Sequence, residues 1–401
     1  MTKGIFVAAA LCSGLLAAGC SSTPFQPQAV AESQFVDRAI TRIDGGVTVR
    51  AAVPTAQETS GLLGLDLYER GIQPVWLEVT NSTEAGVRVA LFSVDSQYYS
   101  PLEVAWYHRK DIRKDDRPSL ERWFYENQMP RTVPAGESRS GFVFTHHTAG
   151  TKGFNVDVYA RNHAYNFTFF VPLPGFTADH MTVDFKALYS DDEIQNLDRD
   201  ELFEYLTNLT WYSTDASGDL AGEPMNVAFV GTMRGLRRSL LRGGWQETPA
   251  GGIETVQARK HHFRGRIPDV TVHKSRPDGT ERKELRLWLT PARYGEQTVW
   301  LGQVSYDMSG GKGDAAYASY RIDPDVDDAK RFLLQNIWYN QSLREATFLR
   351  SGPESLIDNP SVSFDGSEYF TNGVRLVLFV SESPVAFDDT VVTTGAEEQA
   401  E

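Results

Sequence analysis

Positively charged side chains, which could bind anions, are concentrated in one stretch of the second half of this sequence. From Arg234 to Arg286 there are thirteen Lys or Arg against six Asp or Glu, in a chain whose formal charge is −14. Guanidinium and ammonium groups bind phosphates and carboxylates, and arginine does so with a planar fork. The run therefore predicts an anion-binding site, with four candidate residues: Arg264, Arg266, Lys274 and Arg286.

A solvated surface is the competing interpretation of these charges. Arg234, Arg237 and Arg238 have the spacing of the polar face of an amphipathic helix. Arg266 also stands three residues before Asp269, where the two side chains can form an internal ion pair. The sequence alone leaves open whether the charges converge in space.

Three carboxylates are the candidates for catalysis. Asp307, Asp323 and Asp325 could act as acid, base or metal-holding groups beside Arg266, which would make the protein a hydrolase. The acids from Asp323 to Asp328 alternate like the start of a calcium loop, but that loop needs Gly where Asp328 stands and Glu where Leu334 stands. An acid cap followed by Pro324 and further acids is typical of a helix N-terminus, which is the interpretation we favour.

Metal and redox cofactors are not expected. The chain has eight histidines, none in a helical His-x-x-x-His pair with a nearby acid, and two cysteines, Cys12 and Cys20. A thiolate zinc site and a disulfide framework both need more cysteines than remain after a leader is removed. We therefore expect no cofactor and no metal site.

The start of the chain predicts export. Lys3 precedes an apolar run from Ile5 to Leu16, which is too short for a membrane-spanning helix, and Leu16-Ala17-Ala18-Gly19-Cys20 follows. This segment resembles the signal peptide of bacterial lipoproteins, which implies an acylated Cys20 after removal of residues 1–19. The resemblance also implies sorting to the outer membrane with the body in the periplasm, because Ser21 and Ser22 follow the cysteine. An ordinary secretory signal or a plain membrane anchor is the alternative.

Net charge restricts the partners. A chain with 53 acids and 39 Lys or Arg is a poor match for a polyanion. Nucleic acid is therefore not expected as the main partner, since binding it rests on neutralising phosphates. The expected partners are the membrane, through the lipid anchor, and an anionic lipid or an envelope protein.

The first part of the mature chain predicts a sheet structure. Residues 20–36 are polar with two prolines and predict a flexible tether. Residues 37–176 then contain short apolar runs of period two separated by Gly, Pro and Asn turns, which predicts an all-β sandwich resembling immunoglobulin-like domains. The expected strands are 47–53, 75–79, 87–92, 141–144, 154–158 and 165–170. A helix between Asp111 and Gln128 is expected at one end of the sandwich.

Helical and strand patterns mix in the second half. Residues 177–221 predict a helical connector, in which Asp198 and Glu201 form a capping box. Residues 222–383 then predict an α/β or α+β domain with strands at 225–230, 285–290, 299–305 and 374–380 and helices at 234–244 and 323–344. Residues 384–401 are acidic at the end and predict a disordered tail beyond about Asp389.

Several motifs of this half resemble the LssY carboxy-terminal domain. The matching stretches are 225–231, Trp245, 262–269, 285–288, 300–307 and 321–325. The resemblance implies no established activity, although this module also occurs joined to membrane domains of the phosphatidic-acid-phosphatase and DedA types. Two positions depart from it, since Glu284 and Arg321 stand where relatives commonly have histidine.

The sequence thus gives two hypotheses of different class. The first is a lipid-anchored, non-catalytic binding or scaffold protein for an anionic envelope component. The alternative is a hydrolase acting on a phosphorylated lipid or glycan.

Overall fold

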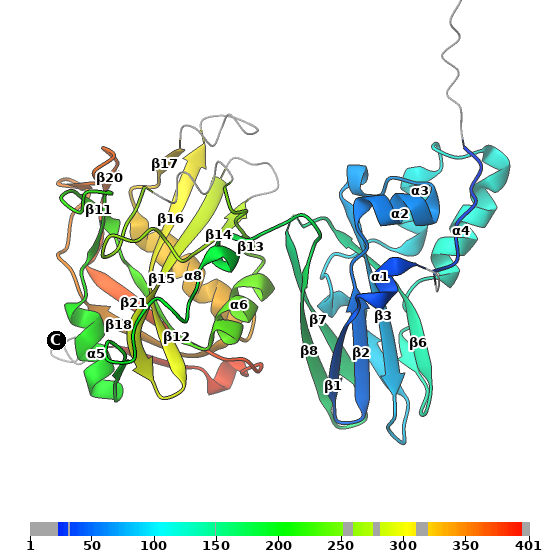
Figure 1. Ribbon diagram of the computed structural model, residues 1–401, viewed down its shortest axis with the longest axis horizontal. Coiled ribbons are helices and arrows are strands. Elements are labelled where there is room, and N and C mark those ends of the chain that lie inside the picture. The colour runs from blue at the N-terminus through cyan, green and yellow to red at the C-terminus, as the bar shows by residue number, and fades with distance from the viewer. Residues whose placement is uncertain are drawn as a thin grey trace, which may run out of the picture.

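The computed structural model describes residues 23–30, 33–148, 150–251, 260–275, 281–309 and 320–394. Figure 1 shows two halves side by side, joined by the chain that follows β8 (Ala164–Pro172). These residues form a mixed α/β protein with several antiparallel sheets and one large mixed sheet. The predicted leader and Cys20 lie outside the described residues.

Two antiparallel sheets share one core in the N-terminal half. One has the order β1 (Ile40–Asp44), β2 (Val47–Ala52), β3 (Ile72–Asn81) and β6 (Ser138–His146), and the other β5 (Thr132–Val133), β4 (Val87–Ala90), β7 (Thr151–Tyr159) and β8. Alternate residues of a strand face the same side, and Val49, Leu77, Val156 and Phe167 meet in one buried cluster. The six strands predicted here are confirmed, while the immunoglobulin likeness stays a prediction.

Helices cover the outer face of the first sheet. They are α1 (Gln34–Asp37), α2 (Ala56–Leu63), α3 (Pro101–His108) and α4 (Arg117–Glu126), and Figure 1 shows α2, α3 and α4 at the upper end of this half. Leu120 and Phe124 of α4 pack with Trp76, Phe142 and Phe144 of the sheet. The helix predicted between Asp111 and Gln128 is therefore confirmed as α4, whereas α2 and α3 were not predicted.

The predicted tether is ordered over most of its length. Thr23 pairs with Ile112, and the Phe25 side chain is buried in the cluster that holds α3 and α4. The backbone N–H of Phe25 donates to Asp116 (3.2 Å) and that of Gln28 to the Leu62 carbonyl (2.8 Å). The prediction of a flexible tether was wrong for these residues, because an apolar Phe25 among polar neighbours is enough to dock the segment.

One large sheet runs through the C-terminal half. Its order is β13 (Gln246–Glu247), β14 (Val270–Ser275), β15 (Glu281–Tyr294), β16 (Gln297–Ser309), β12 (Val227–Gly231), β21 (Val374–Val380), β18 (Leu343–Arg350) and β22 (Val391–Thr394). β9 (Gln195–Asn196) joins β15, and β17 (Tyr320–Ile322) joins β16. β12 is antiparallel to β16 and parallel to β21, which makes the sheet mixed.

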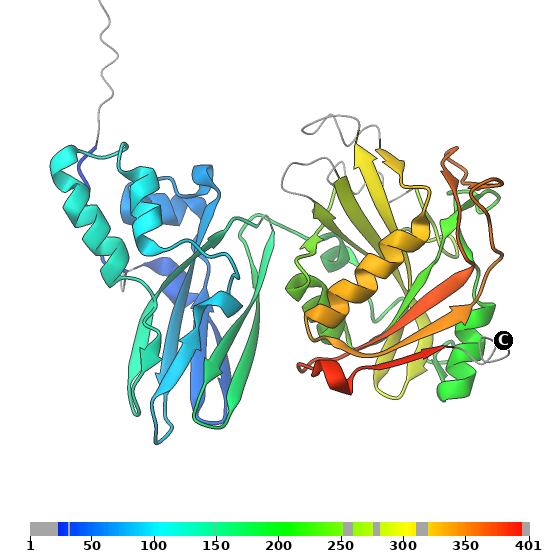
Figure 2. The same cartoon turned by 180° about the vertical axis from the view of Figure 1, so that it is seen from behind.

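Helices lie on both faces of this sheet. α6 (Met233–Arg242) and α8 (Val326–Tyr339) pack on one face, and Figure 2 shows α8, in orange, crossing it. α5 (Arg199–Asn208) packs on the other face against Trp288, Leu301 and Val377. The predicted capping box of Asp198 and Glu201 opens α5, which confirms that helix.

Short elements complete the described chain. Two small hairpins are β10 (Tyr212–Thr214) with β11 (Ala221–Pro224), and β19 (Ser361–Val362) with β20 (Glu368–Tyr369). Single turns of 3-10 helix are Tyr68–Arg70, Leu91–Ser93, Lys114–Asp116, Asp179–Thr182 and Phe387–Asp389.

Two boundaries differ from the sequence prediction. The helix expected over 323–344 is α8, and it ends at Tyr339 because Gln341 takes a left-handed φ of 60°, after which Arg344 lies in β18. The disordered tail was wrong for Val391–Thr394, which form β22 parallel to β18. The four residues Val391 to Thr394 are too few to show the period of a strand in the sequence.

The two halves meet through α6. Gly153 of β7 lies so close to this helix that a Cβ there would fall 2.8 Å from the Leu241 side chain. Arg238 donates from Nε to the Thr168 hydroxyl (3.2 Å), and Arg237 lies over the Phe170 ring at 4.8 Å. The end of α6 is therefore held against β7 and β8.

Candidate functional site

Arg264 and Arg266 lie in one tight turn. Arg264 has a φ of 51° and Gly265 one of 74°, and this left-handed pair lets Phe263 and Arg266 exchange backbone hydrogen bonds of 2.9 and 3.1 Å. Arg266 is already engaged: it forms an ion pair with Asp269 (3.0 Å), donates to the Leu289 carbonyl (2.9 Å) and lies over the Tyr189 ring. The ion pair considered as an alternative from the sequence is thus present.

The other two predicted cations lie elsewhere. Lys274 donates to the Gly243 carbonyl (2.9 Å) at the end of α6. Arg286 is paired across the ladder with Thr271, three residues before Lys274, so the two cations point to opposite faces of the sheet. Arg286 is only 4 % exposed. The four residues therefore do not form one site.

Arg286 belongs to a buried network of charges. Arg282, Glu284 and Arg286 alternate along β15 and lie opposite Asp307, Ser305 and Gln303 of β16, respectively. Glu284 pairs with Arg282 (3.1 Å) and with Arg286 (2.8 Å), and Ser305 donates to Asp307 (2.9 Å). All six side chains are at most 4 % exposed, so this end of the sheet has a polar layer inside the protein.

Residues from outside the two strands complete the network. Gln303 donates to the Glu223 carboxyl (2.5 Å), and Arg286 approaches the same carboxyl at 3.6 Å. His261 lies 3.9 Å from Glu223, and its other ring nitrogen is 2.9 Å from the Ser213 hydroxyl. This order of serine, histidine and glutamate superficially resembles a catalytic triad, but the Ser213 side chain is fully buried and also donates to the Glu223 backbone carbonyl (3.2 Å).

Burial controls ionisation in the network. Removal from water raises the pKa of Glu223 to about 8, although Arg286 opposes the change. Burial and the neighbouring Glu284 raise the pKa of Asp307 to about 6. Burial also lowers the pKa of His261 well below its usual value. The network therefore holds a neutral His261 and a protonated Glu223 near pH 7, with the arginines as its fixed charges.

The sequence predicted other roles for these residues. Arg286 was a candidate for anion binding, Arg282 was counted only in the basic run, and Ser213, Glu223 and Gln303 were not singled out. Local pattern gave no signal, because charged residues that alternate with apolar Leu285 and Leu287 are typical of a strand with one solvated face, whereas the charged face of β15 is buried.

The remaining candidate acids cap a helix. Asp323 accepts the Asp325 N–H (3.0 Å), and Asp325 accepts the Asp327 N–H (3.1 Å) at the start of α8. Capping was the favoured interpretation, and the structure corrects its position, since the N-cap is Asp325 and not Asp323. Arg331 lies 3.5 Å from Asp325. Asp307, buried in the sheet, does not share a cleft with Arg266 in the described structure.

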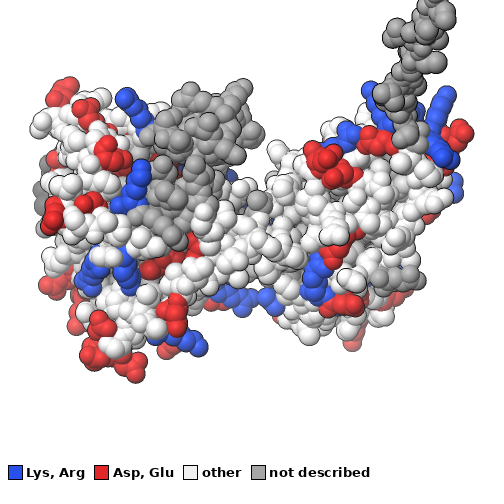
Figure 3. All heavy atoms as spheres, turned by 45° about the horizontal axis from the view of Figure 1, so that its top comes forward, with Lys and Arg blue, Asp and Glu red and all other residues white. Residues whose placement is uncertain are grey.

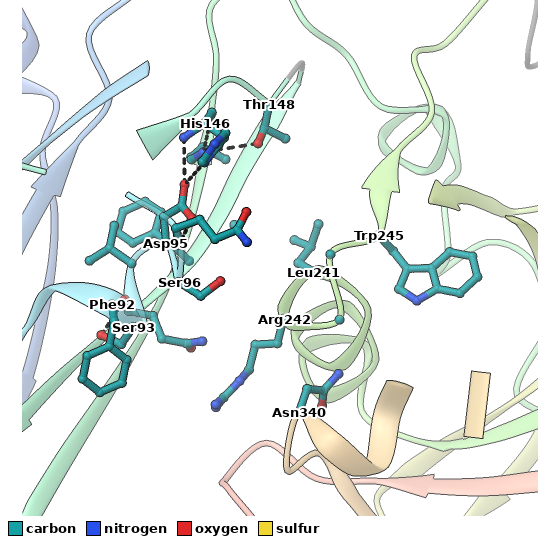
Figure 4. A pocket seen from close by; sticks show the side chains of 18 of the residues that line it. Phe92, Ser93, Asp95, Ser96, His146, Thr148, Leu241, Arg242, Trp245 and Asn340 are labelled. Carbon is teal, nitrogen blue, oxygen red and sulfur yellow. Dashed lines mark hydrogen bonds and ion pairs between the residues drawn. The ribbon is translucent and has the colours of Figure 1, made fainter. Parts of the chain in front are cut away.

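An open cleft lies between the two halves. It has a volume of about 870 Å3 and is lined by residues of the segments 92–97, 146–148, 151–159, 241–246 and 336–341. Figure 4 shows Arg242 extending from the end of α6 into this space, facing the segment that carries Ser93 and Asp95, while Trp245 points away from it. The Nη1 group of Arg242 is buried and has no hydrogen-bond partner among the described residues.

The other charged groups of the cleft are satisfied. Lys152 donates to the His146 carbonyl (2.6 Å) and the Thr148 hydroxyl (3.2 Å), and burial lowers its pKa to about 8. Asp95 accepts from the backbone N–H of His146 (2.7 Å) and contacts its ring (2.9 Å). Asp157 accepts from Asn166 (2.8 Å). Arg242 thus lines the cleft with a buried Nη1 group that has no hydrogen-bond partner among the described residues.

Membrane-spanning helices and metal sites can be assessed for the described residues. No helix among them is long and apolar enough to cross a bilayer. No group of three or more His, Cys, Asp or Glu within the described ranges has the arrangement of a metal site.

Comparison with protein families identifies part of the chain. Residues 259–374 match the LssY C-terminus family. This LssY C-terminal domain lies inside the predicted range of 222–383. No curated protein matches the chain significantly.

The LssY C-terminal domain contains much of the buried network. His261, Glu284, Arg286 and Asp307 lie within the matched residues, as do the caps of α8. Ser213 and Glu223 come from β10 and β11, which precede the match. The cleft is formed jointly, since Arg242 lies before the match, Asn336 and Asn340 lie within it, and the opposite wall belongs to the N-terminal half.

Proposed function

We propose that this chain is a lipid-anchored envelope protein that binds an anionic envelope component in the cleft between its two halves, without catalysis. The observation that carries the proposal is the free donor of Arg242 in that cleft. A buried N–H group without a partner costs free energy. A phosphate or carboxylate group bound beside Arg242 would supply the missing acceptor.

The surroundings of Arg242 carry charges of both signs. Lys152 lines the same cleft with a second positive charge. Of the two carboxylates there, Asp95 contacts His146, and Asp157 accepts from Asn166 and favours the charged form of Arg242 against the effect of burial on its pKa. Lys274, one of the four cations predicted from the sequence, lies at the margin, where its ammonium group binds Gly243. The amides of Asn336 and Asn340 are engaged within the protein, since Asn336 accepts from Trp245 (2.9 Å) and donates to the Gly243 carbonyl (3.0 Å), and Asn340 donates to the Ser239 carbonyl (2.8 Å).

The hydrolase alternative has less support. It needs Asp307, Asp323 and Arg266 around one substrate. Asp307 is buried in the network, Asp323 accepts a backbone N–H at the start of α8, and Arg266 is held by Asp269.

Anchoring and architecture belong to the same proposal. We infer acylation of Cys20, an outer-membrane location and a periplasmic body from the leader and from Ser21 and Ser22. An immunoglobulin-like sandwich for the N-terminal half is supported by its two antiparallel sheets with one shared core. A mass of the purified protein without acyl chains would contradict the anchoring.

The cleft is tested by anion titration. Calorimetry with inorganic phosphate and glycerol phosphate should show binding to the wild type and about tenfold weaker binding to Arg242→Ala, because one charge-assisted hydrogen bond contributes roughly 1.5–3 kcal/mol. Arg344→Ala, an exposed arginine on β18, is the matched control and should bind as the wild type does. Equal affinity of Arg242→Ala and the wild type would contradict the proposal.

The pH dependence gives a second measurement on the same site. Affinity should fall as the pH rises through about 8, because Lys152 then loses its charge. Lys152→Arg should remove this fall, since arginine stays protonated. A fall that persists unchanged in Lys152→Arg would exclude Lys152 from the site.

A further inference from the structure

The point where the chain leaves the folded body is fixed by hydrogen bonds. The backbone N–H of Thr23 donates to the Asp111 carbonyl (3.2 Å), and the N–H of Arg113 donates to the Thr23 carbonyl (3.0 Å). Thr23 is therefore held on the loop between α3 and α4. Only three residue steps separate it from Cys20, a span of at most about 11 Å. Acyl chains on Cys20 would keep this loop at the bilayer surface.

The same loop is rich in positive charge. Arg109, Lys110, Arg113 and Lys114 lie within six residues, and the last three are exposed. Asp111 between them is already paired with Arg70 (2.7 Å) and His108 (2.9 Å). Asp115 and Asp116 follow, of which Asp116 accepts the Phe25 N–H. Figure 3 shows blue side chains at this end of the molecule with red side chains among them.

Exposed apolar and aromatic side chains adjoin these cations. Leu102 and Trp106 are one helical turn apart on α3 and are 54 % and 59 % exposed, and the neighbouring Tyr107 is 43 % exposed. The Arg109 guanidinium lies 3.1 Å from the centre of the Trp106 ring. Tryptophan and tyrosine prefer the headgroup region of a bilayer, and lysine and arginine are attracted to anionic lipids.

We infer that α3 and the loop 109–114 form a docking surface that lies on an anionic lipid bilayer. This inference rests on the proposed lipid anchor for its orientation, and it assigns the anchored protein a second, non-covalent contact with the membrane. Trp106, Tyr107 and Leu102 would enter the headgroup region, and Lys110, Arg113 and Lys114 would face the lipid phosphates. The N-terminal half would then sit against the membrane by its helical end.

Vesicle binding of the mature chain carrying Cys20→Ser tests the surface without the anchor. The chain should sediment with vesicles of phosphatidylglycerol and phosphatidylethanolamine, and less with phosphatidylcholine or at high salt. Lys110→Glu with Arg113→Glu should lower the partition coefficient at least tenfold, because each cation near an anionic surface contributes about 1 kcal/mol. Leu102→Ser with Trp106→Ser should also lower it.

Matched controls come from the other half. Arg344→Glu with Arg350→Glu, and Leu356→Ser with Ile357→Ser, change equally exposed residues and should leave vesicle binding unchanged. Quenching of tryptophan fluorescence by brominated lipid should be lost in Trp106→Phe, which keeps an apolar ring.

Three outcomes would overturn the inference: no preference for anionic vesicles, equal loss in the control variants, or quenching that survives Trp106→Phe. Each is distinguishable from failure of the proposed function. Loss of acylation would appear in the mass of the wild-type protein, and loss of cleft binding would appear in the phosphate titration.

Discussion

At the scale of single residues, the notable feature is a group of charged side chains that are buried from water in the large sheet. In this buried layer Glu284 forms ion pairs with Arg282 and Arg286, and Arg286 approaches Glu223, whose raised pKa keeps it protonated near pH 7. Such buried pairs stabilise a fold weakly, and loss of one partner is costly. The network is therefore best understood as a structural feature of the LssY C-terminal domain that fixes β11 on the sheet.

Glu223 makes this interpretation testable through pH. Its pKa is about 8 in the folded protein and near 4.5 in the unfolded chain, so the folded state holds the extra proton between these values and loses stability as the pH rises through them. Glu223→Gln imitates the protonated form. Between pH 6 and pH 9 the variant should gain roughly 2 to 3 kcal/mol in unfolding free energy relative to the wild type, measured by urea denaturation. Parallel pH profiles of the two proteins would show that Glu223 is ionised in the fold.

At the scale of elements, the alternation of apolar and polar residues predicted the strands that bury one face. Alternation identified β2, β7 and β8, because each strand buries one face in the shared core. α2 and α3 were missed although each opens with a capping box, Thr55 with Glu58 and Ser100 with Glu103, because eight-residue helices show little apolar period.

The residues that come together in the buried network could not be predicted from local pattern. Glu223 and His261 are far apart in the sequence and meet only because β11 folds over the sheet. The cleft depends on the packing of α6 against β7, which no local signal specifies.

The cap of α8 gives a prediction at this scale. Asp325→Ala should lower the free energy of unfolding by about 1 kcal/mol, because the Asp327 N–H loses its acceptor. Asp358→Ala removes an exposed acid from a loop and should have no measurable effect in the same denaturation experiment. If Asp325→Ala were as stable as the wild type, the assignment of this acid to capping would be wrong.

At the scale of the whole molecule, the two halves have complementary tasks in this account. The helical end of the N-terminal half carries the point where the chain leaves the folded body, and we propose that this end faces the membrane. The opposite side of the cleft comes from the end of α6, which precedes the LssY C-terminal domain, and from residues 336–341 within that domain. α6 links the two halves, because it packs on β7 and β8 of the N-terminal half and ends in Arg242 at the cleft.

Anomalous diffraction from crystals grown with selenate tests the central claim most directly, since selenate imitates a phosphate group and its selenium can be located without bias. We expect a selenium peak in the cleft, with a selenate oxygen within hydrogen-bonding distance, about 3 Å, of the Arg242 guanidinium. Selenate bound only at other arginines, with the Arg242 donor still free, would contradict it.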